Sequence, residues 1–299
     1  MPVSTSRAGA LQGRELCPRP LTIVVMQVAI ASMRRFLTLL VASFLSGCST
    51  NAIRIDRLAE TLGMSRSVVE AGGFRSLVFT RGVPAPHDAP LAIFIEGDGV
   101  PWVGGREPSL DPTTGDPLAL KLLGETPPPT AYVTRPCYNE MGGQRCTPER
   151  WTMERYSDEI VSSMTEVVRT VAHQTEARSV ILVGYSGGGV LAVLIAERLD
   201  NVAAVVTIGA NLDVDAWTRY HGYLPLTGSL NPAASTAVHR WPETHLYGVH
   251  DANVPPATAD AYFKRFPSAR RRTEANDHVC CWVEQWPELW KQVAVTSVR

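Results

Sequence analysis

VILVGYSGGGVLAVLIA, residues 180–196, carries the clearest indication of how this chain folds. Its first four residues are aliphatic and predict a buried strand, and the apolar run at 190–196 predicts a helix. Between them lies GYSGG, residues 184–188. A serine on a tight turn between a strand and a helix is typical of a nucleophile elbow, which exposes the hydroxyl and points the helix N-terminus at it. The stretch therefore predicts Ser186 as a nucleophile.

A nucleotide-binding turn is the alternative for these glycines. A dinucleotide site needs an acidic residue about 20 residues further on, at the end of the next strand. Here that strand, predicted at 202–208, ends in Gly209-Ala210-Asn211, and Asp213 comes only later. No lysine follows the glycines, so the turn is not a phosphate-binding P-loop. The local sequence favours the elbow.

The chain as a whole has the composition of one large α/β domain. It has 299 residues, of which 45% are hydrophobic and 19% charged, and its formal net charge of −1 gives no basis for nucleic-acid binding. Predicted strands and helices alternate, which indicates a mainly parallel sheet flanked by helices, with a small cap-like connection at 212–240. The predicted strands are 74–80, 91–95, 131–134, 180–183, 202–208, 244–249 and 270–274. The predicted helices are 49–70, 118–123, 152–173, 190–198, 257–266 and 288–295.

The N-terminal region carries a targeting signal. Residues 33–48, MRRFLTLLVASFLSGC, have a basic start, a short apolar run and a small-residue end, as a signal peptide does. LSGC at 45–48 resembles a bacterial lipobox, which implies cleavage before Cys48, acylation of its sulfur, and a lipid-anchored protein of the outer membrane or periplasm. We therefore divide the chain into a leader (1–47), a lead-in segment (48–69) and a domain (70–299). Whether residues 1–32 are translated, or Met33 is the true start, stays open.

Four further cysteines fit an oxidising compartment. Cys137 and Cys146 enclose a loop that a disulfide would hold. Cys280 and Cys281 are adjacent and either bridge each other or pair elsewhere; four cysteines allow three pairings. Their spacing with His278 matches no common zinc site, so we predict no metal and no cofactor.

A nucleophilic serine needs a base, and that base needs an orienting carboxylate. Asp251 follows the strand at 244–249 and His278 follows the strand at 270–274, so both belong to the sheet edge that carries Ser186. Asp213 and Asp215 are the reserve acids. His250 is the rival base, although it would leave no separate orienting group.

Together these residues resemble the α/β-hydrolase superfamily over about residues 70–295. The resemblance rests on GYSGG, on GVHDANVP at 248–255 and on His278 near the C-terminus. It implies Ser186 as nucleophile, His278 as general base and acid, and Asp251 as the residue that orients the imidazole. The oxyanion hole would combine the backbone N–H groups of Gly187 and Asp98.

EGDG at 96–99, Trp102 and Asn231-Pro232 also resemble a group of bacterial lipoprotein hydrolases. The acidic turn departs from the His-Gly of many relatives, since a carboxylate beside the oxyanion would oppose its charge. Either the side chains of Glu96 and Asp98 turn away into hydrogen bonds or the turn has another role.

Four residues are candidate substrate contacts, and four other histidines are expected at the surface. The contacts are Glu96, Trp102, Tyr185 and His221, although a side chain next to the nucleophile, as Tyr185 is, usually packs into the sheet. The expected surface histidines are His87, His173, His239 and His245.

The sequence thus predicts a serine hydrolase of esterase or lipase type that cleaves a small-molecule or lipid ester through an acyl-enzyme. A thioester or an amide is a less favoured substrate. We expect a monomer, held to the membrane by its N-terminal lipid. The alternatives are an acyltransferase and a non-catalytic binding or assembly lipoprotein on the same fold.

Overall fold

The computed structural model describes residues 50–86 and 89–296. They belong to the second of two compact units, Ser49–Arg299; the first is Met1–Cys48. The predicted leader at 1–47 and the predicted acylation site Cys48 therefore lie outside the described residues. Within the described residues, the structure contains no helix with the length and apolar character that a membrane span requires.

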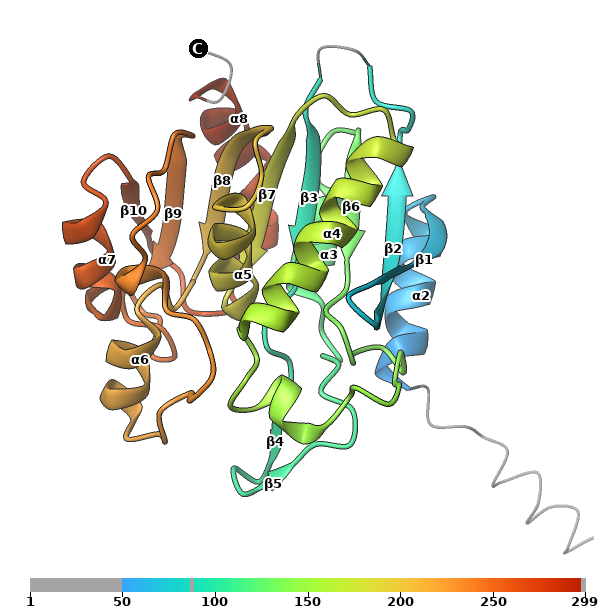
Figure 1. The fold of residues 1–299 in the computed structure, drawn as a ribbon. Helices are drawn as coiled ribbons and strands as arrows, with labels where there is room; N and C mark the ends of the chain where they lie inside the picture. The colour runs from blue at the N-terminus through green and yellow to red at the C-terminus, as the bar shows by residue number, and fades with distance from the viewer. Residues whose placement is uncertain (1–49, 87–88, 297–299) are drawn as a thin grey trace, which may run out of the picture. The chain divides into compact units, whose positions relative to one another are not determined.

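An eight-stranded sheet forms the centre of the second unit, with the strand order β1-β2-β6-β3-β7-β8-β9-β10 (Figure 1). From β6 to β10 all neighbouring strands are parallel, whereas β1 and β2 pair antiparallel at one edge. The carboxyl ends of the parallel strands therefore meet at one edge of the sheet. The strands are β1 (Ser65–Ala71), β2 (Phe74–Arg81), β3 (Leu91–Ile95), β6 (Thr130–Val133), β7 (Val180–Tyr185), β8 (Val202–Ile208), β9 (Glu243–Gly248) and β10 (Arg270–Glu274).

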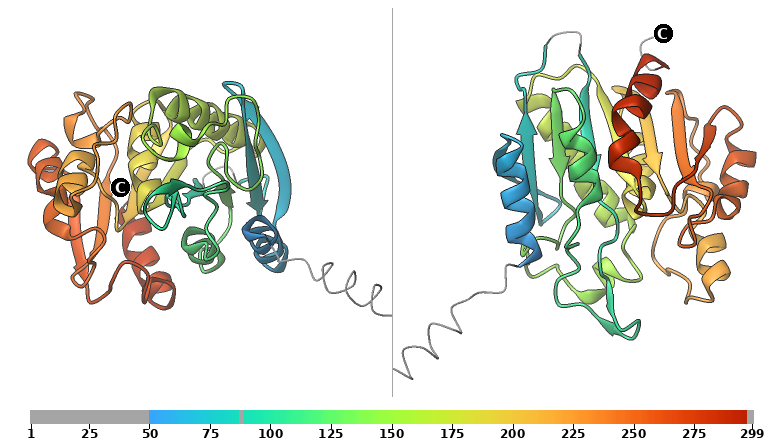
Figure 2. Two further views of the ribbon diagram at one scale, coloured as in Figure 1. Left: turned by 90° about the horizontal axis from the view of Figure 1, so that it is seen from below. Right: turned by 180° about the vertical axis from the view of Figure 1, so that it is seen from behind.

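Helices cover both faces of the sheet (Figures 1 and 2). One face carries α4 (Asp158–Gln174), α5 (Gly187–Ala196) and α7 (Asp260–Arg265), and the other carries α2 (Asn51–Thr61), α3 (Leu118–Gly124) and α8 (Trp282–Thr296). Each face has its own hydrophobic cluster. The central strand β3 is buried along its whole length, as a strand between two helical layers must be. The predicted α/β architecture is confirmed.

Smaller elements gather where the parallel strands end. A two-stranded hairpin, β4 (Trp102–Val103) and β5 (Glu107–Pro108), follows β3, and helix α6 (Val214–His221) lies in the predicted cap-like connection. Figure 1 shows both at the same end of the sheet. The described part of the chain also contains three short 3₁₀ helices: η1 (Pro148–Trp151), η2 (Pro232–Ala234) and η3 (Pro256–Ala259).

The predicted helical lead-in at 49–70 is wrong in its second half. Helix α2 ends at Thr61, and Gly63 adopts a left-handed φ of 67°, which stops a helix. The chain then returns as β1, which pairs with β2 over its whole length. Helical spacing of a few apolar residues could not reveal this partner, which lies across a hairpin.

Two predicted helix starts also shift. Helix α4 begins at Asp158 rather than near 152, because the Ser157 side chain caps it by accepting a hydrogen bond from the N–H of Ile160. Helix α8 begins at Trp282, earlier than the predicted 288. Trp282 and Trp286 are fully buried in the same hydrophobic cluster as Phe94 of β3, so tertiary packing lengthens this helix.

Candidate active site

Ser186 occupies a strained turn between β7 and α5. Its φ of 52° and ψ of −125° fall outside the regions that a non-glycine residue prefers. Its N–H donates to the carbonyl of Ile208, the last residue of β8, at 2.8 Å. The turn is therefore fixed to the neighbouring strand, at the edge where the parallel strands end.

The glycines of the pentapeptide allow the backbones to approach closely. A Cβ at Gly184 would lie 2.3 Å from the carbonyl oxygen of Gly188, and a Cβ at Gly188 would lie 2.3 Å from that of Ile95. No side chain fits at these distances, so both positions require glycine. The GYSGG pattern is thus a packing requirement of this elbow.

Three side chains form a hydrogen-bonded chain at this edge. Nε2 of His278 lies 3.1 Å from Oγ of Ser186, and Nδ1 of His278 lies 2.7 Å from Oδ2 of Asp251. The other oxygen of Asp251 accepts hydrogen bonds from the N–H groups of Asn253 and Val254, and the residue is only 3% exposed. The carboxylate is fixed, and it in turn fixes the imidazole. The structure thus brings together the three residues that the sequence proposed for catalysis.

The two reserve acids have hydrogen-bond partners elsewhere, and the rival base is exposed. Asp213 caps helix α6 by accepting from the N–H of Ala216 at 3.0 Å, and the Nδ2 group of Asn231 donates to both Asp213 and Asp215. His250 is exposed. The Asn231-Pro232 segment therefore holds the start of the cap-like connection in place.

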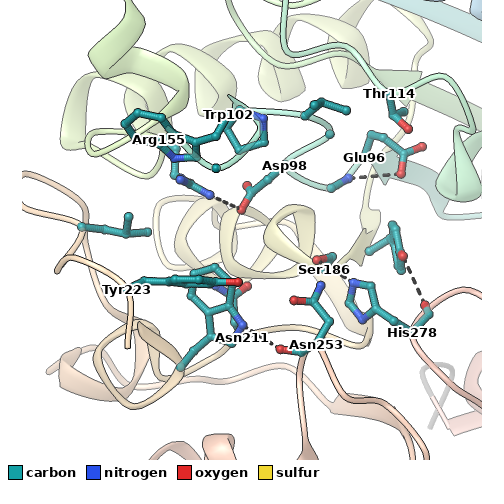
Figure 3. Close-up of a pocket in the computed structure, with 18 of the residues that line it drawn as sticks. Glu96, Asp98, Trp102, Thr114, Arg155, Ser186, Asn211, Tyr223, Asn253 and His278 are labelled. Atoms are coloured by element: carbon teal, nitrogen blue, oxygen red, sulfur yellow. Dashed lines mark hydrogen bonds and ion pairs between the residues drawn. The ribbon is translucent and has the colours of Figure 1, made fainter. Parts of the chain in front are cut away.

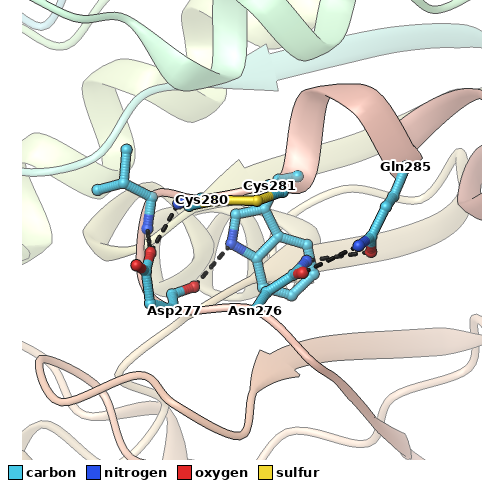
Figure 4. Close-up of a disulfide and its surroundings, with 7 residues drawn as sticks. Asn276, Asp277, Cys280, Cys281 and Gln285 are labelled. Carbon is cyan, nitrogen blue, oxygen red and sulfur yellow. Dashed lines mark hydrogen bonds between the residues drawn. A yellow bond between two sulfur atoms is a disulfide. The ribbon is translucent and has the colours of Figure 1, made fainter.

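Hydrogen bonds and a disulfide hold the loop that carries His278 (Figure 4). Oδ1 of Asp277 accepts hydrogen bonds from the N–H groups of Val279 and Cys280, and the Trp282 indole donates to the Asp277 carbonyl. Cys280 and Cys281 form a disulfide with each other, which settles the pairing left open by the sequence. The second disulfide joins Cys137 and Cys146, as predicted.

A cavity of about 740 Å³ opens above Ser186 (Figure 3). Its walls come from the turn after β3, the β4–β5 hairpin, the connection at 212–240, and the loops that carry Asn253 and His278. Several apolar side chains around it are exposed to solvent. These are Val100, Tyr223, Leu224 and Val279.

Asp98 lies against the elbow but is neutralised by two arginines. Its Oδ1 pairs with Arg135, and its Oδ2 pairs with Arg155 at 2.9 Å and accepts from the Tyr156 hydroxyl at 2.7 Å. Burial alone would raise the pKa of Asp98, but the two guanidinium groups outweigh it and hold that pKa well below its usual range. Two cations against one carboxylate leave a formal charge of +1 beside Gly187.

Glu96, one of the predicted substrate contacts, lines the cavity, but its buried carboxylate is hydrogen-bonded to groups of the protein itself. Its carboxylate accepts hydrogen bonds from the N–H of Gly97 at 3.1 Å, the N–H of Ala119 at 3.0 Å and the Tyr132 hydroxyl at 3.4 Å. It therefore caps the start of α3. Burial raises the pKa of Glu96 to about 7, and these hydrogen bonds only partly oppose that rise. The acidic turn thus resolves into one helix cap and one arginine-bound carboxylate.

Of the other three predicted substrate contacts, two line the cavity and one does not. Trp102 and Tyr185 line the cavity. The Tyr185 hydroxyl donates to the His278 carbonyl at 3.1 Å, and the two rings lie 5.1 Å apart. His221 is absent from the cavity wall within the described residues: its ring stacks on Tyr223, and its Nε2–H donates to the Asn253 carbonyl at 2.7 Å. It therefore supports the cavity from behind, because Tyr223 and Asn253 line it.

Sequence reasoning missed Arg135, Arg155 and Asn211. A signal existed for Arg135, which follows β6 next to β3, and for Asn211, which follows β8, because residues after parallel strands meet at one edge. None existed for Arg155, which is 57 positions from Asp98 in the chain. In residues 50–86 and 89–296, no group of three or more His, Cys, Asp or Glu side chains could hold a metal ion.

Comparison with known proteins rests on structure. No family model and no curated protein sequence matches the chain. An esterase from Pyrococcus furiosus superposes with a TM-score of 0.56 at 14% identity, over 80% of this chain and 91% of that one. Est1E from Butyrivibrio proteoclasticus superposes with a TM-score of 0.53 at 15% identity, over 78% of this chain and 98% of that one. The esterase domain of a Rhodothermus marinus protein superposes with a TM-score of 0.52 at 16% identity, over 79% of this chain and 98% of that one.

A protein of unknown function from Agrobacterium tumefaciens, described as a putative α/β hydrolase, also superposes. Its TM-score is 0.53 at 10% identity, over 78% of this chain and 98% of that one. At these identities the likeness concerns the fold. Sheet order, elbow and structural neighbours agree, and the chain has the α/β-hydrolase fold.

Proposed function

We propose that the protein is a serine hydrolase that cleaves an ester through an acyl-enzyme intermediate. The observation that carries the proposal is the hydrogen-bonded chain from Asp251 through His278 to Ser186, at the floor of a cavity large enough for an ester substrate. The esterases among the structural neighbours support it as analogy only.

The proposed reaction has two halves. In the first, Oγ of Ser186 attacks the ester carbonyl while Nε2 of His278 takes the hydroxyl proton. The tetrahedral intermediate collapses, the bond to the alcohol breaks, and the alcohol leaves with the proton from Nε2. In the second half, water attacks the acyl-serine and gives its proton to the same nitrogen, which returns it to Oγ as the acid departs. Asp251 stabilises the imidazolium in both halves.

Charge near the elbow favours the oxyanion that forms in each half. The N–H groups of Gly187 and Asp98 have no hydrogen-bond partner among the described residues, so both are free to donate. The Arg135 and Arg155 guanidinium groups outweigh the Asp98 carboxylate. A buried net positive charge stabilises a developing negative charge more strongly than it would in water. The acidic turn therefore does not argue for a non-catalytic protein.

A fluorophosphonate probe and p-nitrophenyl esters of graded chain length test the proposal. We expect the wild type to be labelled and to hydrolyse at least one ester, and Ser186→Ala to lose both activities by about 10⁴-fold or more. Ser67→Ala is a matched control, because Ser67 is an exposed serine on β1. Folded wild-type protein that neither labels nor hydrolyses would favour the binding lipoprotein. Faster acyl transfer to an added alcohol than to water would favour the acyltransferase.

We also propose that Cys48 is acylated and anchors the protein to a bacterial outer membrane or periplasmic membrane surface. The lipobox-like LSGC supports this, as do the two disulfides, which suit an oxidising compartment. We expect Cys48→Ser protein to leave the membrane fraction and to lack lipid by mass spectrometry of its N-terminal peptide. Cys17→Ser is the matched control and should stay anchored. Lipid on the Cys48→Ser protein would exclude this site.

A further inference from the structure

Asn211 has a buried side-chain amide that makes no hydrogen bond to the described part of the protein. It follows β8, lines the cavity, and is only 2% exposed, yet neither Oδ1 nor Nδ2 has a hydrogen-bond partner among the described residues. Its neighbours are fixed: the Ala210 carbonyl accepts from the Tyr247 hydroxyl at 2.9 Å, and the Leu212 carbonyl accepts from the N–H of Ala233 at 3.0 Å. The backbone therefore holds the amide in the cavity wall.

A polar group in this situation opposes folding. Burying an amide without partners costs free energy that an apolar side chain of the same size would not cost. Buried polar groups without a structural partner need an explanation, and a ligand is one. Asn211 lines the cavity above Ser186 (Figure 3), so a molecule bound in that cavity is the ligand to consider.

The chemistry of that group follows from its surroundings. The amide offers one acceptor and two donor hydrogens and carries no charge. Two charged groups of the cavity wall have partners of their own: Asp98 pairs with Arg155, and Asp116 pairs with Lys121. Arg106, which also lines the cavity, is exposed on the turn between β4 and β5. A neutral group that both donates and accepts hydrogen bonds fits Asn211 best.

We propose that Asn211 binds a hydroxyl or amide group of the substrate close to the scissile ester, and so determines specificity. The inference rests on the proposed hydrolase function and adds the substrate class. The position is close to the reaction, since Ser186 is hydrogen-bonded to Ile208, and Asn211 follows Ile208 by three residues. Trp217, Tyr223 and Leu226 supply an apolar wall for the rest of the molecule.

Matched ester pairs test this inference. On the acyl side, p-nitrophenyl 3-hydroxybutanoate is compared with the butanoate, and p-nitrophenyl N-acetylglycinate with the pentanoate. On the alcohol side, 1-butanoylglycerol is compared with propyl butanoate. We expect kcat/KM for the polar member of at least one pair to be about tenfold or more higher, because leaving Asn211 unpaired disfavours the apolar member. The pair that responds tells a hydroxyl from an amide.

Asn211→Leu should bring that ratio to within about threefold of one, because leucine has a similar size and no hydrogen-bonding atoms. Its melting temperature should equal or exceed that of the wild type, since no intramolecular hydrogen bond is lost. Asn211→Ala is the second variant. Asn201→Leu is the matched control: Asn201 lies just before β8, at the other end of that strand from Asn211, and is not among the described residues that line the cavity, so the preference should persist.

Three results would overturn the inference while fluorophosphonate still labels Ser186. They are no preference in any pair, a preference that survives both Asn211 variants, and a lower melting temperature in both. The last would give Asn211 a structural role. Loss of labelling of the folded wild type would instead overturn the hydrolase proposal, and this inference with it.

Discussion

Two histidine–carboxylate pairs in this molecule differ in what the second imidazole nitrogen contacts. In the His278–Asp251 pair, Nε2 faces the Ser186 hydroxyl at the floor of a cavity. In the His239–Glu243 pair, the other nitrogen faces a second carboxylate, Glu197, at 2.9 Å. A histidine with one nitrogen oriented and the other directed at a hydroxyl can move a proton, whereas a histidine between two carboxylates is held as a cation.

The His239–Glu243 pair is surrounded by contacts that serve to hold the fold together. His239 stacks on Phe266 with ring centroids 3.9 Å apart, and the Tyr262 hydroxyl donates to Glu243 at 2.6 Å. His245, which is fully buried, also contacts Glu243, at 3.0 Å. Our expectation that His239 and His245 lie at the surface is therefore wrong. The comparison shows that residue type alone does not distinguish a reactive histidine from one that holds two elements together.

Exchanging each histidine should have opposite consequences, and this is the largest effect we expect. His278→Gln should lower kcat for a p-nitrophenyl ester by about 10³- to 10⁴-fold, because Ser186 loses its base, and should leave the melting temperature nearly unchanged. His239→Gln should keep activity within about threefold and lower the melting temperature. Steady-state kinetics and thermal unfolding of both variants test these two expectations. If His239→Gln lost activity while fully folded, the two pairs could not be separated in this way.

Removing one charge from the second pair should cost stability without changing the chemistry. Glu243 is 2% exposed at its side chain, so Glu243→Gln leaves His239 with a single carboxylate and should lower the free energy of unfolding by about 3 kcal/mol in urea titrations. Glu288→Gln is the matched control. That carboxylate and its partner Lys291 are both mostly exposed, so its effect should stay within about 0.5 kcal/mol. Equal effects in the two variants would contradict the role of burial.

The pH dependence of that stability follows from two pKa shifts. Burial opposes both shifts. Hydrogen bonds with His239 and His245 nevertheless lower the pKa of Glu243 from 4.5 to about 2, and hydrogen bonds with Glu197 and Glu243 raise that of His239 from 6.5 to about 9. The Glu243 contribution is present above pH 4.5 and is lost as the pH falls toward 2. The His239 contribution is complete below pH 6.5 and is lost as the pH rises through 9.

The stabilisation that wild type has over the His239→Gln/Glu243→Gln double variant should therefore be largest between about pH 4.5 and 6.5. Urea unfolding of both proteins from pH 3 to pH 10 measures it. A difference that increases from pH 7 to pH 10 would show that His239 is not held as a cation.

The smallest effect concerns the far end of the same cluster. The Thr207 hydroxyl contacts Nδ1 of His245 at 2.8 Å, so Thr207→Val should lower the free energy of unfolding by about 1 kcal/mol. Thr130→Val is the matched control, because the buried Thr130 hydroxyl has no hydrogen-bond partner among the described residues and its removal should cost nothing. A cost at position 130 that equals the cost at 207 would assign both effects to packing.

Much of the candidate active site was predictable because its residues lie next to strong local signals. Ser186 sits between an aliphatic strand and a glycine-rich helix start, and Asp251 and His278 each follow a predicted strand. Parallel strands end at one edge, so residues after them meet there. The hydrophobic pattern could not reveal that residues 65–71 form a strand. This strand is defined by its pairing with β2, and its own sequence shows no clear strand periodicity.

The α/β order, the elbow and the three residues that meet there follow from local sequence, because hydrophobic periodicity and turn chemistry act over a few neighbouring residues. Which charges are neutralised, which histidine is buried and which amide lacks a partner became clear only from the packed fold. Asp98 and Arg155 are far apart in the chain, and His239 contacts Glu197 across 42 positions. Electrostatic and hydrogen-bonding partners depend on distance in space and on exclusion of water, and both arise only when the sheet and its helices have packed.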